Sequence, residues 1–436
     1  MDSPTPPYAT PRRTFLKALA AAGVASPLLA RVERLEAALP PVTPSVPFRH
    51  DDPAAIRALA EQYMVGDDLI YLNHASIGTV PRPVHEAHVG YLGLCERHPS
   101  LYVWGRVWRD VLEETREAAA TLLRCEPDDL AITHNTTEGF NILAQGLPLG
   151  PGDEVLFSSL NHPGASVAWR GQASRRGFTV RDFDFPLTRA AEMTVDEVVR
   201  LHAGAVGPQT RALVIPHVDN MVGMVHPLPA IADAVRARGV EYVLVDGAQS
   251  VGMIPVELDA SGVDAYAASP HKWLQTPKGL GLFWASAGLR ASLPRMWYRT
   301  SGTAIEGSAR QYEDYSTRAW PAVVALGDAL AFQASIGTQE KTRRYRALRR
   351  HVQERVEGEA GLRWKSPVDP ELASIIMAVE VTGSSAPSLG QVLLADAGVV
   401  LRSFGPPLNS LRVSPNVTTS EEELDGFLDA ALALAG

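Results

Sequence analysis

The sequence predicts an α/β protein with a mostly parallel sheet, followed by a smaller α+β domain. From about residue 70 to residue 285, short apolar runs alternate with segments of helical spacing, which is the pattern of strands joined by right-handed crossovers. Two of these runs, Tyr242 to Val245 and Val263 to Ala268, are followed by polar or charged residues. Because ligands bind beyond the carboxyl ends of parallel strands, we expect the functional site at this edge.

Length and composition set the outer limits. The 436 residues suffice for two domains, and 46% hydrophobic with 20% charged residues is ordinary for a globular protein. A net charge of −9 gives no general attraction to nucleic acid. We expect a signal and linker over residues 1–38, an N-terminal arm over 39–68, a large domain over 69–305 and a small domain over 306–436.

The N-terminus has the order of an export signal. Arg12 and Arg13 precede Phe-Leu-Lys and then an apolar run from Ala18 to Ala30. A run of about 13 residues is too short to span a bilayer, so no stable membrane span is expected. The paired arginines resemble a twin-arginine signal, which predicts export to the periplasm or beyond. An amphipathic helix or a disordered tail is the alternative.

Cys95 and Cys125 are the two cysteines of the chain, and they form no C-x-x-C pair. We therefore expect no metal site and no disulfide framework. Both lie in apolar helical patterns, so they are expected to pack in the core.

Apolar runs and helical spacing place the remaining elements. Strands are expected over residues 70–72, 131–133, 152–157, 211–216, 242–245 and 263–268. Helices are expected over residues 51–63, 83–97, 104–124, 139–147, 165–176, 229–238, 318–336 and 340–359, and from residue 421. Short apolar segments at 374–381, 391–397, 399–402 and 411–413 indicate the small domain. The helix over 340–359 is basic, and a solvated face explains it better than nucleic-acid binding.

Asp246 and Lys272 each follow one of the two apolar runs named first. An acid and a lysine placed in this way suit a pyridine cofactor, pyridoxal phosphate, held as a Schiff base. The lysine forms the imine, and the acid keeps the ring nitrogen protonated so that the ring accepts electrons. Burial and nearby cations would lower the pKa of Lys272 enough to make its amine nucleophilic.

Further polar side chains at strand ends complete the expected site. Gln249 lies one turn beyond Asp246 and is placed to donate to the ring hydroxyl, and His162 is placed to stack on the ring. The loop from Asn73 to Gly78 is built of small residues that let backbone approach a ligand. A phosphate cradle is expected from Thr136, Thr137, Ser269 and His271. Taken alone, Thr136 is better explained as a helix N-cap and His162 as a loop residue.

These segments resemble the class V aminotransferase family, within the fold-type I pyridoxal phosphate enzymes. The most specific segments are Asp246-Gly247-Ala248-Gln249 and Ser269-Pro270-His271-Lys272-Trp273. Thr136-Thr137-Glu138, Asn161-His162 and His217-Val218-Asp219-Asn220 support them in the same order. The resemblance runs from Tyr71 to Ser414. It implies the fold of that family, with a seven-stranded, mostly parallel sheet in the large domain.

The resemblance also implies a role for each residue. Lys272, Asp246 and His162 would be catalytic, as the Schiff-base lysine, the partner of the pyridine nitrogen and the stacking group. Arg412 matches the arginine that grips the substrate carboxylate, with Asn73 and Ala75 in the substrate site. Gly302 and Thr303 match a loop lent to the neighbouring subunit's phosphate site, which implies a homodimer. The implied cofactor-binding set is Thr136, Thr137, His162, Asn220, Asp246, Gln249, Ser269, His271, Lys272, Gly302 and Thr303.

The family includes several reactions at the α-carbon of an amino acid. Desulfurases carry a nucleophilic cysteine shortly before the arginine that matches Arg412, and residues 401–410 contain none. The segment from Tyr312 to Arg318 is similar to isopenicillin N epimerase-type members. We therefore expect an epimerase or a transaminase that works through a Lys272 aldimine, with a C–S or other β-lyase as the alternative. The sequence does not identify the donor of the second proton that an epimerase needs, although His74 and Arg318 lie in loops that could reach the site.

Two other classes stay open at this point. One is a pyridoxal-binding protein without turnover, and the other is an exported α/β binding protein without the cofactor. An intact Lys272 speaks against the first.

Overall fold

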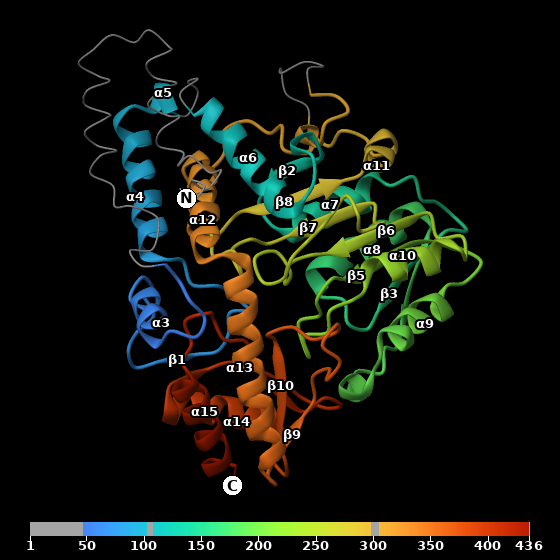
Figure 1. Cartoon of the computed structure of the whole chain (residues 1–436). Helices are drawn as coiled ribbons and strands as arrows, with labels where there is room; N and C mark the ends of the chain where they lie inside the picture. The colour runs from blue at the N-terminus through green and yellow to red at the C-terminus, as the bar shows by residue number, and fades with distance from the viewer. Residues whose placement is uncertain (1–46, 103–107, 298–304, 436) are drawn as a thin grey trace, which may run out of the picture.

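The computed structural model describes residues 47–102, 108–297 and 305–435. The predicted export signal, and Gly302 and Thr303 of the expected phosphate loop, lie outside these residues. The large sheet and its helices occupy the upper right of Figure 1, and the small domain lies below them. No helix in the described ranges combines the length and the apolarity that crossing a bilayer requires.

Seven strands form the large sheet in the order β2-β8-β7-β6-β5-β3-β4. β8 runs antiparallel to both neighbours and the other pairs are parallel, which confirms the predicted mostly parallel seven-stranded sheet. The strands are β2 (Leu130–Thr133), β3 (Glu154–Ser158), β4 (Thr179–Phe183), β5 (Thr210–Pro216), β6 (Tyr242–Asp246), β7 (Ala265–Ala268) and β8 (Gly281–Ala285). The apolar runs did not predict β4 and β8.

Both faces of this sheet are buried, which explains why its strands are apolar along their whole length. In β6, Val243 and Val245 belong to one core, while Tyr242 and Leu244 belong to the other. The first core includes side chains of α6 (Arg109–Leu123), α9 (Val195–Ala205), α10 (Leu228–Arg236) and α12 (Trp320–Ile336). The second includes side chains of α7 (Thr136–Gly146), α8 (Pro163–Arg176) and α11 (Ala287–Ser292). The result is a three-layer α/β/α sandwich.

The C-terminal part forms a second sheet with its own core. Its strands are antiparallel in the order β12-β13-β10-β9. The strands are β9 (Leu362–Trp364), β10 (Met377–Val381), β12 (Arg402–Phe404) and β13 (Ser410–Val413). The helices packed with them are α13 (Thr338–Gly358), α14 (Ala386–Ala397) and α15 (Glu421–Ala433). This confirms a smaller α+β unit after the large sheet.

The N-terminal part of the described chain packs with this C-terminal unit. β1 (Ile70–Tyr71) pairs in parallel with β11 (Val399–Val400), and Phe48 and Leu59 contribute to the C-terminal core. The remaining helices of this part are α3 (Pro53–Ala60), α4 (Arg82–Arg97) and α5 (Pro99–Tyr102). The large sheet therefore lies, in sequence, between two segments of the chain that pack against each other.

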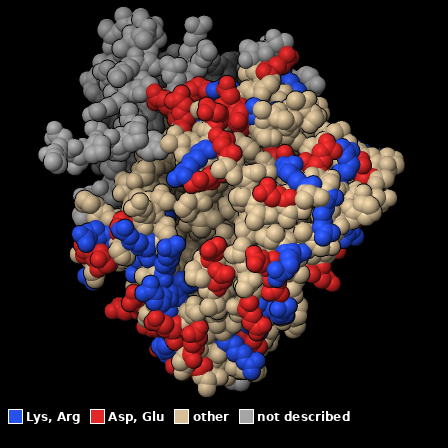
Figure 2. Space-filling view, turned by 45° about the vertical axis from the view of Figure 1, so that its right-hand side comes forward, with Lys and Arg blue, Asp and Glu red and all other residues tan. Residues whose placement is uncertain are grey.

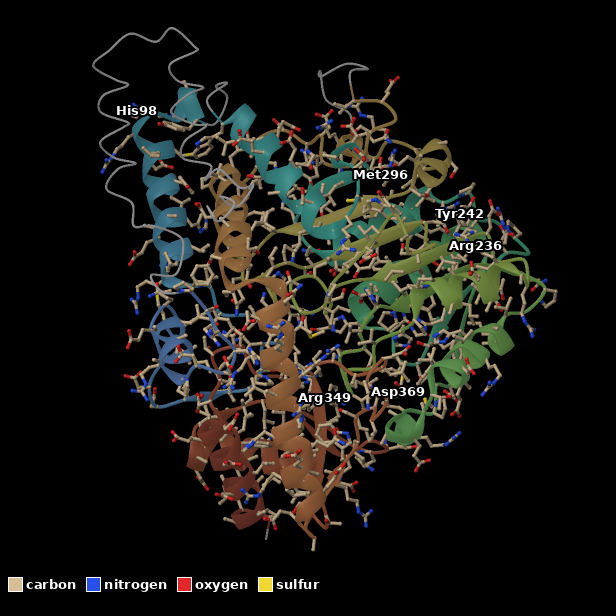
Figure 3. The ribbon with its side chains drawn as sticks, viewed as in Figure 1. His98, Arg236, Tyr242, Met296, Arg349 and Asp369 are labelled. Carbon is tan, nitrogen blue, oxygen red and sulfur yellow. The ribbon has the colours of Figure 1, made fainter. Side chains whose placement is uncertain are left out.

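Several basic side chains of α13 bond to groups of the small domain. Arg349, labelled in Figure 3, is buried and donates to the carbonyl oxygen of Ser374 at 2.6 Å. Arg344 donates to the carbonyl of Thr419 at 2.7 Å, and Arg355 pairs with Asp429 at 2.6 Å. Basic and acidic side chains both occur on the face drawn in Figure 2. Arg344, Arg349 and Arg355 are therefore explained by contacts within the chain.

The two cysteines are free. Cys95 is buried in α4, and Cys125 is partly buried just after α6. Burial, reinforced by Asp259, raises the pKa of the Cys125 thiol to about 12. Burial also raises the pKa of Cys95. Neither thiol is a ready nucleophile, because the thiolate is the reactive form.

Gly223 joins the large sheet to the small domain. Its φ is +72°, and a Cβ at this position would lie 2.1 Å from the carbonyl oxygen of Ile376. Its carbonyl oxygen accepts the Ser374 hydroxyl at 2.7 Å. A side chain here would meet both backbone strain and a backbone clash.

We therefore expect Gly223→Ala to lower the free energy of unfolding by about 2 kcal/mol or more. The matched control is Gly93→Ala in the interior of α4, where a Cβ meets nothing within 4 Å. That variant should gain up to about 1 kcal/mol from helix propensity. Thermal unfolding followed by circular dichroism measures both, and equal effects would contradict this account of Gly223.

Candidate active site

Asp246 and Lys272 reach the same edge of the large sheet because β6 and β7 are parallel neighbours. Asp246 is the last residue of β6 and aligns with Ala267 of β7. Lys272 follows the end of β7 in a tight loop. Both line one cavity with three other predicted residues, His162, Asn220 and Gln249. The structure therefore brings together the acid, the lysine and the expected stacking group.

The two charges of this cavity adjust each other. Burial raises the pKa of Asp246, whereas the hydrogen bond from the Ala248 N–H at 2.9 Å and the charge of Lys272 lower it. Burial lowers the pKa of Lys272 to about 8, against the opposing effect of Asp246 and with a further decrease from Arg412. A lysine with this pKa is partly neutral at neutral pH, so it can act as a nucleophile or a proton acceptor.

The small-residue loop after β1 approaches the Lys272 loop closely. The Gly78 N–H donates to the His271 carbonyl at 3.1 Å, and a Cβ on Gly78 would lie 1.8 Å from the Lys272 carbonyl oxygen. The Lys278 ammonium donates to the Gly78 carbonyl at 3.2 Å. The small residues of this loop were predicted to let its backbone approach a ligand. At Gly78 the structure shows a close approach to the backbone of His271 and Lys272.

The start of α7 lies against the end of β7. Asn135, and not Thr136, is the N-cap, since its side chain accepts from the Glu138 N–H at 2.9 Å. The Thr136 N–H donates to the Ser269 hydroxyl at 3.1 Å, and the two hydroxyls are 2.8 Å apart. Thr137 is exposed in the first helical turn. Backbone N–H groups and hydroxyls at a helix N-terminus suit an anion such as phosphate.

The surroundings of His271 and His162 define the protonation of their rings. The Nδ1 atom of His271 is buried and has no hydrogen-bond partner among the described residues. Burial lowers the pKa of His271 to about 4, so its ring is neutral. His162 caps α8, and its Nδ1 accepts the Gly164 N–H at 3.1 Å. A neutral His162 therefore carries its proton on Nε2.

Gln249 connects the cavity to the loop after β1. Its Nε2 donates to the Ala75 carbonyl at 2.8 Å, and its Oε1 accepts from the Trp273 indole N–H at 2.8 Å. One N–H of the amide stays available for a ligand. Ala75, predicted in the substrate site, is fixed in turn by the Ser414 hydroxyl at 3.2 Å. The Trp273 contact was not predicted, although Trp273 belongs to the quoted motif.

Arg412 comes from β13 of the small domain and is buried at 2% exposure. Its guanidinium donates to the Asn220 carbonyl at 3.0 Å, to Asn73 Oδ1 at 2.7 Å and to the Ser76 hydroxyl at 2.5 Å. Its Nε is buried without a partner among the described residues. Since no carboxylate of the described chain pairs with it, Arg412 is free to take an anion.

A second arginine lies beside it. Arg402 aligns with Arg412 across β12 and β13, and both guanidinium groups lie 5.9 Å from the ring centre of Phe404. Burial first and the charge of Arg402 second lower the pKa of Arg412 to about 10, so Arg412 keeps its charge at neutral pH. Arg402 could not be predicted from the sequence, because only the strand pairing shows that it lies beside Arg412.

Asp219 holds the turn that presents Asn220. Its carboxylate is fully buried and accepts from the N–H groups of Met221 at 2.7 Å, Val222 at 2.9 Å and Met224 at 2.6 Å. Asp219 lies inside a quoted motif, yet its role in the turn required the structure. It acts by positioning the Asn220 carbonyl that Arg412 contacts.

His74 and Arg318, the two residues considered for the second proton, form hydrogen bonds away from the cavity of Lys272. His74 is buried, with Nδ1 at 3.3 Å from the Ser414 carbonyl and Nε2 at 3.2 Å from the Thr79 hydroxyl. Burial lowers its pKa to about 4. Arg318 donates to the Ile132 carbonyl at 2.7 Å and lies over the rings of Tyr315 and Trp320. Neither lines the cavity of Lys272.

Comparison with known proteins identifies relatives along most of the chain. The model of the aminotransferase class-V family matches residues 70–426. Isopenicillin N epimerase of Amycolatopsis lactamdurans is 31% identical over 395 residues, covering 86% of this chain and 97% of that protein. A probable cysteine desulfurase of Pseudomonas putida is 27% identical over 410 residues, covering 88% and 96%.

A solved structure shares the fold. A mutant of C-DES with glycine covalently linked to its PLP cofactor superposes with a TM-score of 0.75 at 24% identity. The match covers 85% of this chain and 98% of that one. This likeness concerns the fold.

The pKa of Lys272 should shift in opposite directions when each of its two charged neighbours is replaced. In ligand-free protein, the rate of acetylation of Lys272 by acetic anhydride should be half-maximal near pH 8 and not near the ordinary pKa of 10.5. Asp246→Asn removes the charge that stabilises the ammonium, so the midpoint should fall. Arg412→Met removes a repelling charge, so the midpoint should rise. Peptide mass analysis across pH measures all three, and shifts of the same sign in both variants would refute the assignment.

Proposed function

The chain belongs to the aminotransferase class-V family and is a pyridoxal-phosphate-dependent enzyme, and we propose that it acts at the α-carbon of an amino acid. Within that class we propose epimerisation, with transamination as the second candidate. The observation that carries the proposal is the shared cavity of Asp246, Lys272, His162 and Gln249, with Arg412 unpaired by any carboxylate of the described chain.

The residues present fit this cofactor. Lys272 offers an amine of lowered pKa, and Asp246 offers a buried carboxylate for a protonated ring nitrogen. The start of α7, with Ser269 beside it, offers donors for a phosphate. The orphaned Nδ1 of His271 is a further buried polar atom in need of a partner.

The bound cofactor supplies a protonated pyridine ring that withdraws electrons from the α-carbon of an attached amino acid. The chain's own residues supply the rest. Arg412 orients the substrate by its carboxylate, held in place by Asn73, Ser76 and the Asn220 carbonyl. Lys272, with a pKa of about 8, would accept the α-proton near neutral pH. Epimerisation then requires a proton delivered to the opposite face of the α-carbon, whereas transamination requires one delivered to the cofactor.

Two observations favour epimerisation over desulfuration. Isopenicillin N epimerases of Amycolatopsis lactamdurans and Streptomyces clavuligerus are 31% and 29% identical over most of their length. Residues 401–410 contain no cysteine, and Cys95 lies in α4 and Cys125 just after α6, both with raised pKa values. Cysteine-based sulfur transfer at this site therefore lacks its nucleophile.

The cofactor assignment is tested by covalent capture. Protein purified with pyridoxal phosphate should be yellow, and borohydride reduction should leave the cofactor's mass on the peptide of Lys272. Lys272→Ala should lose the colour and the adduct. The matched control is Lys278→Ala, which removes a lysine six positions away whose ammonium contacts Gly78. It should keep the adduct on Lys272, while a colourless wild-type protein would rule out the cofactor.

The reaction is tested with L- and D-amino acids in deuterated water, including isopenicillin N. Epimerisation predicts deuterium at the α-carbon with inverted configuration, measured by NMR and chiral chromatography. Lys272→Ala should slow this exchange by at least about 100-fold, the lower end of a general base's contribution.

Other products identify the other reactions. An oxo acid formed with conversion of the cofactor to its amine indicates transamination, and loss of a β-substituent indicates a lyase. Absence of exchange with every amino acid, in protein that has captured the cofactor on Lys272, would contradict catalysis and leave a cofactor-binding protein.

A further inference from the structure

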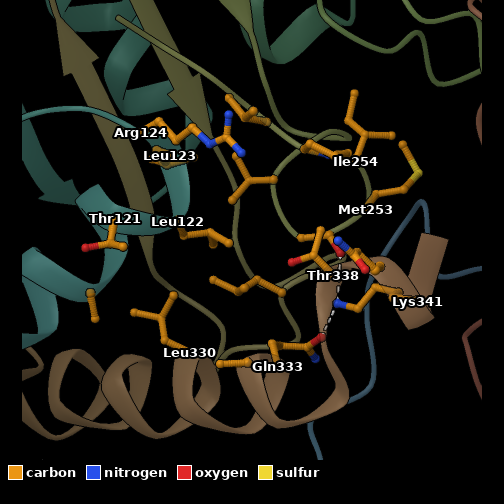
Figure 4. A pocket seen from close by; sticks show the side chains of 18 residues that line it. Thr121, Leu122, Leu123, Arg124, Met253, Ile254, Leu330, Gln333, Thr338 and Lys341 are labelled. Atoms are coloured by element: carbon orange, nitrogen blue, oxygen red, sulfur yellow. Dashed lines mark hydrogen bonds between the residues drawn. The ribbon is translucent and has the colours of Figure 1, made fainter. Parts of the chain in front are cut away.

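A second cavity lies behind the loop that carries Lys272. It has a volume of about 480 Å³ and is lined by the end of α6, residues 251–256, Leu274, the end of α12 and the start of α13 (Figure 4). Exposed Thr121, Ala334 and Thr338 lie at its mouth, and buried Val251 and Lys341 lie at its inner end. Its size falls in the range of small-molecule sites.

Lys341 is the chemical feature of this cavity. Its side chain is 6% exposed, and its ammonium donates to the Gly252 carbonyl at 3.0 Å and to the Gln333 side-chain oxygen. In Figure 4, Lys341 extends toward Gln333. No carboxylate of the described residues pairs with it. A lysine has three donors, so one N–H remains for a ligand.

The other charge at the cavity is already balanced. Arg124, just beyond the end of α6, forms an ion pair with Glu257 at the surface. Lys341 is therefore the buried cation of this cavity that lacks an anion within the described chain. Burying an ammonium without a counter-ion is costly, and neutral oxygens offset this cost only in part.

We propose that this cavity binds a small organic monocarboxylate whose carboxylate pairs with Lys341 and whose apolar body fills the rest of the space. The walls fit such a body, because apolar residues of α6, α12 and the loop line the cavity, namely Leu122, Leu330, Met253 and Val256. A single unbalanced cation selects one negative charge, and the apolar walls disfavour a more highly charged ligand.

The position of the cavity links such a ligand to the active site. Lys341 holds the Gly252 carbonyl, and a Cβ on Gly252 would lie 2.5 Å from the Leu274 backbone nitrogen. Leu274 lines the second cavity, and its neighbour Trp273 donates to Gln249 in the first. A ligand in this cavity would therefore lie beside the loop that carries Lys272, because Leu274 of that loop lines the cavity.

Calorimetric titration of the cofactor-loaded protein with phenylacetate and hexanoate tests the proposal directly. Each should bind saturably, and the neutral amide of each should bind at least about tenfold more weakly. Lys341→Met keeps the length of the side chain but removes the charge, and it should weaken carboxylate binding by about tenfold or more. Ala334→Trp narrows the mouth from an exposed position and should weaken binding while leaving Lys341 intact.

The second carboxylate site must be separated from the first. Arg412→Met removes the guanidinium of the active site, and binding to Lys341 should persist in it within about twofold, because Arg412 does not line this cavity. Binding that is lost in Arg412→Met but kept in Lys341→Met would overturn the proposal, because the anion would then occupy the active site. Absence of binding to the wild type at about 10 mM ligand would also overturn it, since that concentration exceeds a millimolar Kd. Neither result depends on the reaction that the enzyme catalyses.

Proton uptake gives an independent readout. Burial lowers the pKa of Lys341 to about 7, and no charged group contributes to that shift. The groups packed around it are neutral Gln333 and Gln275, the buried Tyr63 hydroxyl that donates to Gln275 at 2.6 Å, and the Arg124–Glu257 pair at the mouth. A bound carboxylate raises the pKa of Lys341. Binding should therefore take up almost no proton at pH 6 and an increasing fraction at pH 8, measured in buffers of different ionisation enthalpy. Equal uptake at both pH values would exclude Lys341 as the partner.

Discussion

The parallel pairing of β6 with β7 is the constraint on which the rest of the site depends. It aligns Asp246 with Ala267, and the Gly247 N–H continues the ladder to the Ala267 carbonyl at 2.8 Å. Asp246 and the loop that carries Lys272 therefore lie at the same edge of the sheet. The neighbouring strands β5 and β3 end at the same edge and bring Asn220 and His162 to the same cavity. A slip of one residue in this pairing would turn Asp246 to the other face of the sheet.

Charge balance explains why the site needs ligands as well as residues. Burial lowers the pKa values of Lys272 and Arg412, while the charge of Asp246 opposes this shift at Lys272 and the charge of Asp219 opposes it at Arg412. Arg402 adds a further positive charge that lowers the pKa of Arg412. In a dry site such cations are stabilised further by anions. In the proposed function, a substrate carboxylate on Arg412 and a phosphate at α7 would supply them. The same reasoning applies to Lys341, where the cation is buried behind the loop and no other group of the described chain balances it.

Much of this arrangement was predictable because the strands that build it are buried on both faces. β3, β5, β6 and β7 stand out as apolar runs, and the residues that follow them gave the acid, the lysine and the stacking histidine. β4 was missed because it is a partly exposed edge strand with charged residues, and β8 because it returns antiparallel without a polar site residue after it. The Asn135 cap was missed because Thr136 and Asn135 are both good caps by composition, and only geometry separates them.

The contacts that complete the site could not be read from the sequence, because they join segments far apart in the chain. β1 pairs with β11, which lies more than 300 residues later, and this pairing places Asn73 and Ser76 against Arg412. Asp219 and Gly223 fix the turn between Asn220 and the small domain. Lys272 thus belongs to the large sheet and Arg412 to the small one, and the close approach of Gly78 to the Lys272 loop connects them. A displacement of catalytic groups by about 1 Å is enough to impair catalysis. The packing between the two units therefore matters for activity, because it fixes the position of Arg412 relative to Lys272.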